Sequence, residues 1–311
     1  MVKRINRAIE LLESDQPIYY TGLHSFSRNF LTYEQGIKDS SIWADYINIG
    51  MEHGAFDMGG LEAYMDGLLD GGPTASGHVT PAVIVELPVQ GENSEVIKYN
   101  AWQVRQILAR GVHGILLCEA TTPEAVAAFV ESCRYKLNDI GVGYGLQDGT
   151  RGVGSEFTAK LKWGLKDDNE YREKADPWPL NPDGELMLGV KIEDRYCLEN
   201  AEDIAATPGL IFGEWGPGDM GMSFGLADAH DPPYPQEMLD AYNRVKSAYI
   251  KENMAFLSSW GKSSEDDNYS IESSEEGLLY VTKEIGSQIL RPKTKEQAEF
   301  IRKNATYPKR G

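Results

Sequence analysis

The sequence predicts an α/β protein that forms a single (β/α)8 barrel over residues 1–311. Short apolar runs that read as buried strands alternate with longer amphipathic stretches that read as helices, and this alternation is typical of a parallel sheet. About eight such units occur in one chain, which favours a closed barrel over an open sheet. An acidic residue follows each of two of these runs, Glu193 and Asp219, near the strand ends where barrel active sites gather.

Nine apolar runs are candidates for the eight strands, so we expect one of them to be wrong. Helices are predicted between them, for example over residues 102–109, 123–134 and 235–251. The second of these has a clear start, because Thr122 suits an N-cap and Pro123 suits the first turn. The candidate strands are residues 18–23, 46–51, 82–87, 114–118, 152–154, 187–192, 210–213, 254–258 and 278–281.

Two polar segments are predicted to be loops inserted into the barrel. Residues 164–184 hold the run Lys166-Asp167-Asp168-Asn169-Glu170, and residues 262–277 carry many acids among serines. Charged runs of this kind are usually solvated. We therefore expect both segments to be loops that contribute to the shape of the barrel mouth at most.

The composition bounds the class of protein. The net charge of -18 disfavours binding to nucleic acid or to an anionic membrane surface. No apolar run approaches the roughly 18 residues of a membrane span, and no secretory signal follows the basic start. The three cysteines have no metal-ligand spacing, so reduced thiols in a cytoplasmic protein are expected.

Two carboxylates predict a metal site. Glu193 ends the strand candidate at 187–192, and Asp219 follows the strand candidate at 210–213 within Gly-Pro-Gly-Asp. Acids at the carboxyl ends of successive parallel strands lie close together in a barrel. Oxygen ligands suit a hard divalent cation, so we expect Mg²⁺ or Mn²⁺, with Co²⁺ as a further candidate, on Glu193 and Asp219.

A histidine completes the predicted site. The strand candidate at 46–51 runs into Glu52-His53-Gly54, which places His53 at the same rim as the two acids. An imidazole there can titrate near neutral pH and move protons. His24 follows the first strand candidate and is expected to face the mouth as well, where it would contact substrate.

These motifs together resemble the HpcH/HpaI aldolase family, the class II pyruvate aldolases related to the citrate lyase β-subunit. The resemblance covers most of residues 19–226. The matching stretches, in the family's order, are Glu52-His53-Gly54, Arg151-Gly152-Val153-Gly154-Ser155, Ile192-Glu193 and Gly216-Pro217-Gly218-Asp219-Met220 followed by Gly225.

The resemblance implies a barrel of the phosphoenolpyruvate/pyruvate type and a lyase that cleaves or forms a C–C bond. A 2-oxo acid such as pyruvate and an aldehyde would be its substrates, with a divalent metal on Glu193 and Asp219 and His53 as the base. Gly218 and Asp219 would hold the substrate carboxylate through their backbone N–H groups. The family also implies a homo-oligomer, a trimer or hexamer, in which the C-terminal tail, residues 285–311, packs on a neighbouring subunit.

Three positions depart from the family pattern. Gly50 stands where the family has an aspartate that orients the histidine, and Glu52 is the nearest acid that could take that role. Glu86 stands at or next to an arginine position at the end of the third strand. Lys191 replaces a glutamine two residues before the metal glutamate. Since strand side chains alternate, Lys191 shares a face with Glu193.

We hypothesise that Lys191 supplies the cation that the third strand lacks, paired with Glu86, so that Lys191 and Glu86 join His53 as catalytic residues. A purely structural Lys191–Glu86 ion pair is the equal alternative. Two other functions stay open: a divergent lyase that breaks a different bond, and a catalytically weak metabolite-binding barrel. Besides Asp219, Gly218 and His24, Glu52 is expected to contact substrate.

Overall fold

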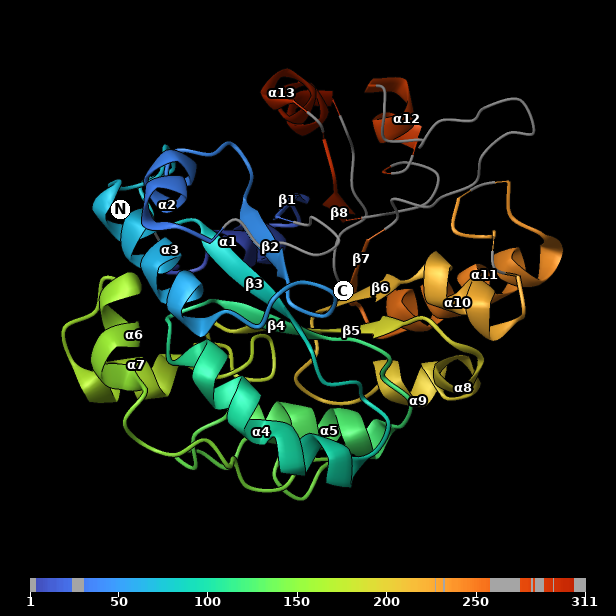
Figure 1. Cartoon of the computed structure of the whole chain (residues 1–311), viewed down its shortest axis with the longest axis horizontal. Helices are drawn as coiled ribbons and strands as arrows, with labels where there is room; N and C mark the ends of the chain where they lie inside the picture. The colour runs from blue at the N-terminus through green and yellow to red at the C-terminus, as the bar shows by residue number, and fades with distance from the viewer. Residues whose placement is uncertain are drawn as a thin grey trace.

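One sheet of eight parallel strands forms the centre of the protein, in the order β7-β6-β5-β4-β3-β2-β1-β8 (Figure 1). A parallel bridge between Leu257 and Ile289 links the ends of that order, so the sheet closes almost completely on itself. The predicted (β/α)8 barrel is confirmed. The strands are β1 Ile18–Leu23, β2 Tyr46–Gly50, β3 Ala82–Leu87, β4 Gly114–Leu117, β5 Met187–Ile192, β6 Phe212–Trp215, β7 Ala255–Phe256 and β8 Ile289–Leu290.

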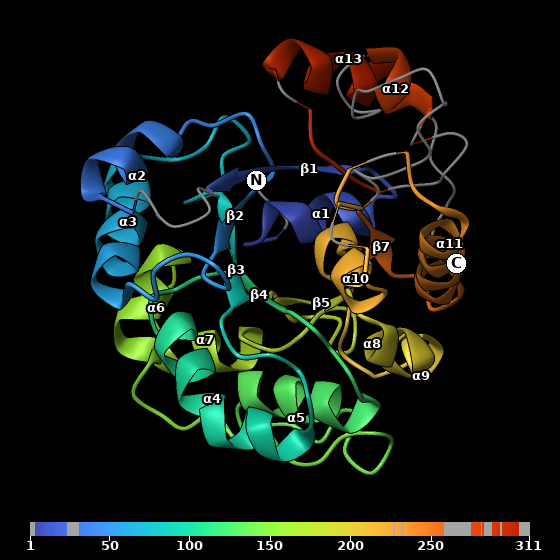
Figure 2. The same cartoon turned by 45° about the vertical axis from the view of Figure 1, so that its right-hand side comes forward.

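This computed structural model describes residues 4–23, 31–226, 228–231, 233–257, 275–280, 282, 288–292 and 294–304. Helices surround the sheet (Figure 2). None of the described helices is both long and apolar enough to cross a membrane. The helices are α1 Arg7–Glu13, α2 Tyr33–Asp39, α3 Met58–Asp70, α4 Ser94–Leu108, α5 Pro123–Cys133, α6 Glu156–Lys162, α7 Asp168–Lys174, α8 Arg195–Glu199, α9 Ala201–Ala205, α10 Pro217–Ser223, α11 Gln236–Lys251, α12 Glu275–Tyr280 and α13 Lys295–Asn304.

Local sequence signals set several of these helix boundaries. The Thr122 side chain accepts a hydrogen bond from the Ala125 N–H, and Pro123 occupies the first turn of α5, as predicted. Asn93 caps α4 in the same way, accepting from the Glu95 and Val96 N–H groups. Such caps satisfy donors that a helix start leaves unpaired.

Two strand predictions are wrong. Residues 152–154 form an exposed turn before α6, and the nearby pairing is an isolated bridge between Tyr135 and Arg151. The part of residues 278–281 that the structure describes lies in α12, where Leu278 packs with Leu290 and Ile301. A four-residue apolar run cannot distinguish a strand from one face of a helix. The true eighth strand, β8, has only two residues and left no periodic signal.

The predicted insertion at residues 164–184 is not a solvated loop throughout. It contains α7, and Tyr171, Asp176 and Trp178 are buried. The carboxylate of Asp176 accepts hydrogen bonds from the buried guanidinium of Arg134, so an acid in a polar run serves the interior. Most of the second predicted insertion, residues 262–277, lies outside the described residues, and its last three belong to α12.

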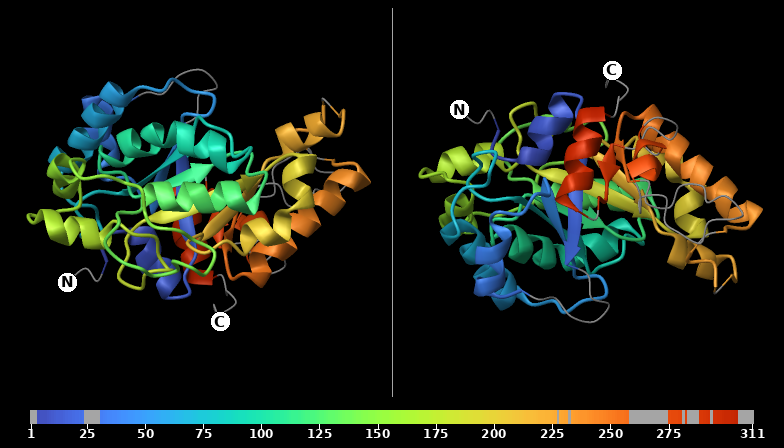
Figure 3. Two further views of the ribbon diagram at one scale, coloured as in Figure 1. Left: turned by 90° about the horizontal axis from the view of Figure 1, so that it is seen from below. Right: turned by 90° about the horizontal axis from the view of Figure 1, so that it is seen from above.

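The apolar core has two layers, one between strands and outer helices and one inside the barrel. The inner layer includes Tyr46, Ile84 and Phe212, together with four apolar residues of α1. The helix α1 therefore closes the amino-terminal end of the barrel and leaves its carboxyl-terminal end as the open mouth. Figure 3 shows α10 and α11, in yellow to orange, projecting from one side of the barrel.

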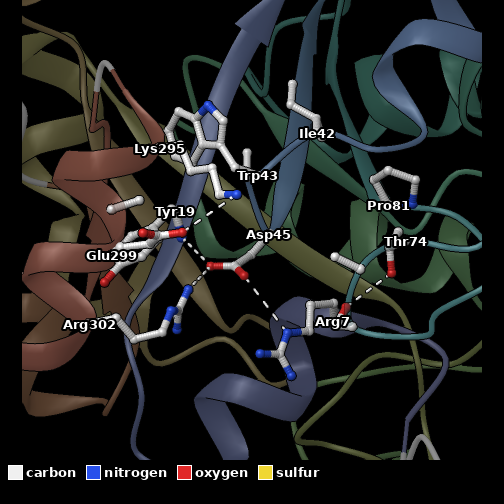
Figure 4. A pocket seen from close by; sticks show the side chains of 14 residues that line it. Arg7, Tyr19, Ile42, Trp43, Asp45, Thr74, Pro81, Lys295, Glu299 and Arg302 are labelled. Carbon is white, nitrogen blue, oxygen red and sulfur yellow. Dashed lines mark hydrogen bonds and ion pairs between the residues drawn. The ribbon is translucent and has the colours of Figure 1, made fainter.

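A second closure lies where α13 packs against the same amino-terminal end. The Arg302 guanidinium donates to Asp45 at 2.7 Å and lies 4.2 Å from the centre of the Tyr19 ring. Asp45 also accepts from the Tyr19 N–H at 2.8 Å and faces Arg7 at 3.8 Å (Figure 4). These groups line a cavity of about 220 Å³ that also includes Lys295. The cavity lies at the opposite end from Glu193.

The Asp45 cluster predicts a measurable loss of stability. Asp45→Ala would leave the Arg302 guanidinium and the Tyr19 N–H without their shared acceptor, so we expect the free energy of unfolding to fall by about 1–3 kcal/mol. Urea unfolding measures this change. The exposed Asp240 of α11 is the matched control, and Asp240→Ala should change stability by less than about 0.5 kcal/mol. Equal effects of the two substitutions would contradict the role of Asp45.

A buried histidine predicts a pH dependence. Burial, and then the charge of His78, lowers the pKa of His113 to about 3, and its Nδ1 accepts the Val83 N–H at 3.2 Å. Because the folded pKa is below the unfolded value of about 6.5, folding favours the neutral ring. The stabilisation is therefore present above pH 6.5 and is lost as the pH falls toward 3.

We expect His113→Asn, which keeps an acceptor but cannot titrate, to flatten the decline in unfolding free energy between pH 6 and pH 4. Urea melts of both proteins across this range measure the difference between the two curves. All other titrating groups are the same in the two proteins, so their contributions cancel in that difference. Parallel curves for the two proteins would show that His113 is not responsible.

Candidate active site

A polar layer lies above the apolar interior of the barrel. Side chains alternate along a strand, so Asn48, Glu86, Lys191 and Glu214 share the inward faces of β2, β3, β5 and β6 with the inner core residues. Lys191 and Glu214 are direct partners in the β5–β6 register. The Asn48 amide donates to Glu86 Oε1 at 2.7 Å. Charged groups therefore line the floor of the mouth.

Lys191 bridges two carboxylates of this mouth. Its Nζ donates to Glu52 Oε2 at 2.8 Å and lies 3.7 Å from Glu193 Oε2. The expected Lys191–Glu86 pair is thus replaced, among the ion pairs that the structure records for Lys191, by contacts with Glu52 and Glu193. Glu86 instead has Asn48 as a hydrogen-bond partner. The sequence placed Lys191 beside Glu193 and Glu52 at the same mouth, but it did not predict that Lys191 pairs with Glu52.

Glu193 is held from two sides. It is 1% exposed, and its Oε1 accepts the Glu119 N–H at 2.9 Å. Its Oε2 lies against Gly216, where a Cβ would come within 2.3 Å of that oxygen. Any residue larger than glycine at 216 would displace the carboxylate. The first glycine of the Gly-Pro-Gly-Asp motif therefore has a steric role beside the predicted metal ligand.

His53 lies at the outer edge of the mouth. Its side chain is 64% exposed, and Nε2 lies 3.7 Å from Glu52 Oε2. One donor atom each from Glu52, His53 and Asp219 lie within 4.8 Å of one another, although they come from two segments far apart in sequence. The carboxylate of Glu52 is therefore the acid that lies beside the imidazole. Gly50, three residues before the histidine, has no side chain that could take that place.

The carboxylates of the mouth influence one another strongly. Burial raises the pKa of Glu193 well above its usual value, and the charges of Glu52 and Asp219 add to this rise, against the opposing effect of Lys191. Burial, then Asp219, raises the pKa of Glu119 to about 7. The negative charges repel in a partly desolvated space, so a bound cation would stabilise them.

Lys191 and Glu52 respond as an ion pair. Burial by itself would lower the pKa of Lys191, but the surrounding acids raise it well above its usual value. Burial by itself would raise the pKa of Glu52, but the charge and hydrogen bond of Lys191 lower it. Lys191 is therefore an ammonium at neutral pH, and Glu52 is a carboxylate.

A second donor group lies deeper in the mouth. One atom each from Glu52, Cys118 and Glu193 also lie within 4.8 Å of one another. Burial raises the pKa of Cys118 well above its usual value, so the thiol stays protonated and is a poor ligand for a hard cation. Glu52 belongs to both groups, so its carboxylate connects Glu193 in the inner group with Asp219 in the outer one. Carboxylate oxygens of this kind are the ligands that suit Mg²⁺ or Mn²⁺.

The remaining predicted residues differ in how much the structure says of them. Gly218 and Asp219 lie in the first turn of α10, and a Cβ at Gly218 would come within 3.1 Å of His230. His24 lies outside the described residues. The structure therefore brings Glu52, His53, Glu193 and Asp219 to one mouth and leaves His24 unplaced.

Sequence reasoning missed Glu214 as a member of the mouth. Burial, and then the charges of Lys191, which lowers it, and Glu86, which raises it, bring the pKa of Glu214 to about 7. The signal was present, because Glu214 lies two residues after Phe212 on the inward face of β6. Glu119 was noted at a strand end, but its role is through its backbone, which has the unusual φ of 45° and directs the N–H to Glu193.

Comparisons with known proteins identify relatives of this chain. A family model described as HpcH/HpaI aldolase/citrate lyase matches residues 79–277. A hydroxypyruvate/pyruvate aldolase of Chromohalobacter salexigens is 32% identical over 133 residues, which are 43% of this chain and 44% of the relative. A 2-keto-3-deoxy-L-rhamnonate aldolase of Klebsiella pneumoniae is 26% identical over 162 residues, 52% of this chain and 51% of the relative.

These matches cover about half the length of the curated relatives. A solved structure of an HpcH/HpaI aldolase/citrate lyase family protein from Burkholderia cenocepacia covers 96% of this chain and 97% of its own, with a TM-score of 0.65 and 19% identity. That likeness shows the fold. The family model spans well over half of the chain, and the matched residues include Glu86, Glu193 and Asp219. The chain therefore belongs to the HpcH/HpaI aldolase/citrate lyase family.

Proposed function

We propose that the protein is a divalent-metal-dependent aldolase that cleaves or forms a C–C bond beside the carbonyl of a 2-oxo acid. Family membership and the names of the relatives, aldolases for hydroxypyruvate, pyruvate and a keto-deoxy sugar acid, support this class. The observation that carries the proposal is the convergence of Glu52, His53 and Asp219, within 4.8 Å of one another, beside the buried Glu193.

The donor set supports Mg²⁺ or Mn²⁺ as the metal, held by Glu193 and Asp219. A bound divalent cation would supply Lewis-acid charge at the keto oxygen of the 2-oxo acid. Glu193 is prepared for such a role, because the Glu119 N–H and the wall at Gly216 fix its carboxylate. A fixed ligand loses little conformational freedom when it binds.

His53 would move the proton. Its exposed imidazole lies at the edge of the mouth, where a substrate enters, and the Glu52 carboxylate 3.7 Å away would stabilise the imidazolium form. The ring would accept a proton from the carbon beside the carbonyl, or from the hydroxyl of an aldol, and return it in the reverse direction. The backbone N–H groups of Gly218 and Asp219, in the first turn of α10, would orient the substrate carboxylate.

A second function keeps the same proton chemistry but breaks a different bond. Glu86 favours it, because a carboxylate, hydrogen-bonded to Asn48, occupies the third strand where the resemblance implies a cation. Such a lyase would still exchange the protons beside the carbonyl. It would differ from an aldolase in releasing no aldehyde from 4-hydroxy-2-oxo acids.

Exchange of the methyl protons of pyruvate tests the proposed function. We expect the protein with Mn²⁺, in deuterated water, to replace these protons with deuterium, because removal of a proton beside the carbonyl is the first half of aldol addition. Mass spectrometry of pyruvate, after the metal is removed, measures the incorporation. Addition of a chelator should return exchange to the rate without protein. Exchange that is absent with Mg²⁺, Mn²⁺ and Co²⁺ alike would refute the proposal.

Replacement of His53 tests the role of the imidazole. We expect His53→Gln to slow exchange by about 10²–10⁴-fold, the usual contribution of a positioned acid or base. The affinity for Mn²⁺ should change much less, since Glu193 and Asp219 remain. His78→Gln, at the opposite end of the barrel, is the control and should exchange at the normal rate. A His53→Gln protein with normal exchange would assign proton transfer to another group.

A further inference from the structure

We propose that Lys191 is a built-in competitor of the divalent cation at the mouth, and that Glu52 becomes a third carboxylate ligand of the cation once it leaves Lys191. The proposal rests on the proposed function only in taking Glu193 and Asp219 as metal ligands. It adds two roles that are specific to the side chains of this chain: an ammonium that weakens metal binding and a carboxylate that changes partner.

The first argument is the position of the ammonium. Lys191 Nζ lies 2.8 Å from Glu52 Oε2 and 3.7 Å from Glu193 Oε2, so it already neutralises part of the charge that a metal would neutralise. The side chain of Lys191 is 12% exposed, and those of Glu52 and Glu193 are 8% and 2% exposed. Charges so little hydrated interact strongly, and a divalent cation on Glu193 would be repelled by the ammonium.

The second argument is the double membership of Glu52. With Cys118 and Glu193 it forms the inner donor group, and with His53 and Asp219 it forms the outer one. Its carboxylate therefore lies between the two proposed ligands, of which Glu193 directly follows β5 and Asp219 lies in α10. A carboxylate in that position can serve Lys191 through one oxygen or a cation through the other, but full coordination requires it to release the ammonium.

The third argument is the freedom of the lysine to withdraw. A lysine carries its charge on a flexible four-carbon stem, so the ammonium can move while the strand stays fixed. Glu86 and Glu214 lie on the same inward-facing side of the barrel as Lys191, and Glu214 is its direct partner in the β5–β6 register. Against the opposing effect of burial in each case, the charge of Glu86 raises the pKa of Lys191, and the charge of Lys191 lowers the pKa of Glu214. The ammonium thus has other carboxylates toward which to turn when a cation takes Glu52.

Calorimetric titration of the metal-stripped full chain with Mn²⁺ alone tests the competition. We expect Lys191→Met to lower the Kd for Mn²⁺ at least tenfold, because a positive charge leaves the site. Lys191→Gln is the second variant, for use if the Lys191→Met protein does not fold. Its neutral amide removes the positive charge but can still donate hydrogen bonds to the carboxylates. Lys160→Met is the matched control. It removes a partly buried lysine of α6 that pairs with Asp168, and it should leave the Kd unchanged.

A double-mutant cycle tests the role of Glu52. In the wild-type background Glu52→Gln should change the Kd for Mn²⁺ by less than about threefold. The substitution removes a carboxylate ligand of the cation, but it also removes the ion-pair partner that holds the Lys191 ammonium at the site, and the two effects on the Kd oppose each other. In the Lys191→Met background the same substitution should raise the Kd at least tenfold, since Glu52 is then a full ligand. Equal effects in the two backgrounds would overturn the ligand role of Glu52.

The outcomes separate this inference from the proposed function. Unchanged or weaker Mn²⁺ binding in both Lys191 variants would overturn the competition, even if wild-type protein exchanges the protons of pyruvate. Tighter binding in the variants would support it, even if no exchange is seen and the proposed function fails. Absence of Mn²⁺ binding in the wild type and in every variant would overturn both.

Discussion

The contact between the Lys191 ammonium and the carboxylates of Glu52 and Glu193 is the interaction on which the mouth depends. Parallel strands deliver all their carboxyl ends to one side of a barrel, so acids that lie far apart in sequence meet there. Without a cation among them, buried carboxylates would repel or take up protons. Lys191 supplies one such positive charge, and in our proposal the same charge competes with a bound metal.

The other end of the molecule has the opposite construction. There α1 packs its apolar residues into the barrel interior, and α13 is tied down by Arg302 and Asp45. These contacts close the amino-terminal end, although two cavities remain there, one lined by Asp45 and Arg302 and one by His78 and His113. Because the amino-terminal end is closed and the charged residues lie at the carboxyl-terminal mouth, the chemistry is confined to that one face. The same fold can therefore support different reactions, which a few side chains at the mouth determine.

Those side chains distinguish this chain from the pattern that its motifs resemble. An acid, Glu86, lies on the third strand, and a lysine, Lys191, lies two residues before the predicted metal ligand Glu193. The ion pairs recorded for Lys191 are with Glu52 and Glu193 and not with Glu86. Glu86 receives a hydrogen bond from Asn48, while Lys191 reaches outward to Glu52. Glu52 thereby connects His53, which we propose as the base, with Lys191 and the predicted metal ligands.

The amino-acid sequence by itself determined the barrel, because alternation of apolar runs and amphipathic stretches is a local property that each segment carries. It also predicted that Glu193, Asp219 and His53 lie at one rim, because each comes within four residues after the end of a strand. It could not identify β8, whose two residues have no periodicity, or recognise residues 278–280 as a helix. Only the tertiary structure decided that Lys191 pairs with Glu52. That contact depends on the register between strands and on side-chain reach across the barrel, and neither is encoded in the spacing along a single chain.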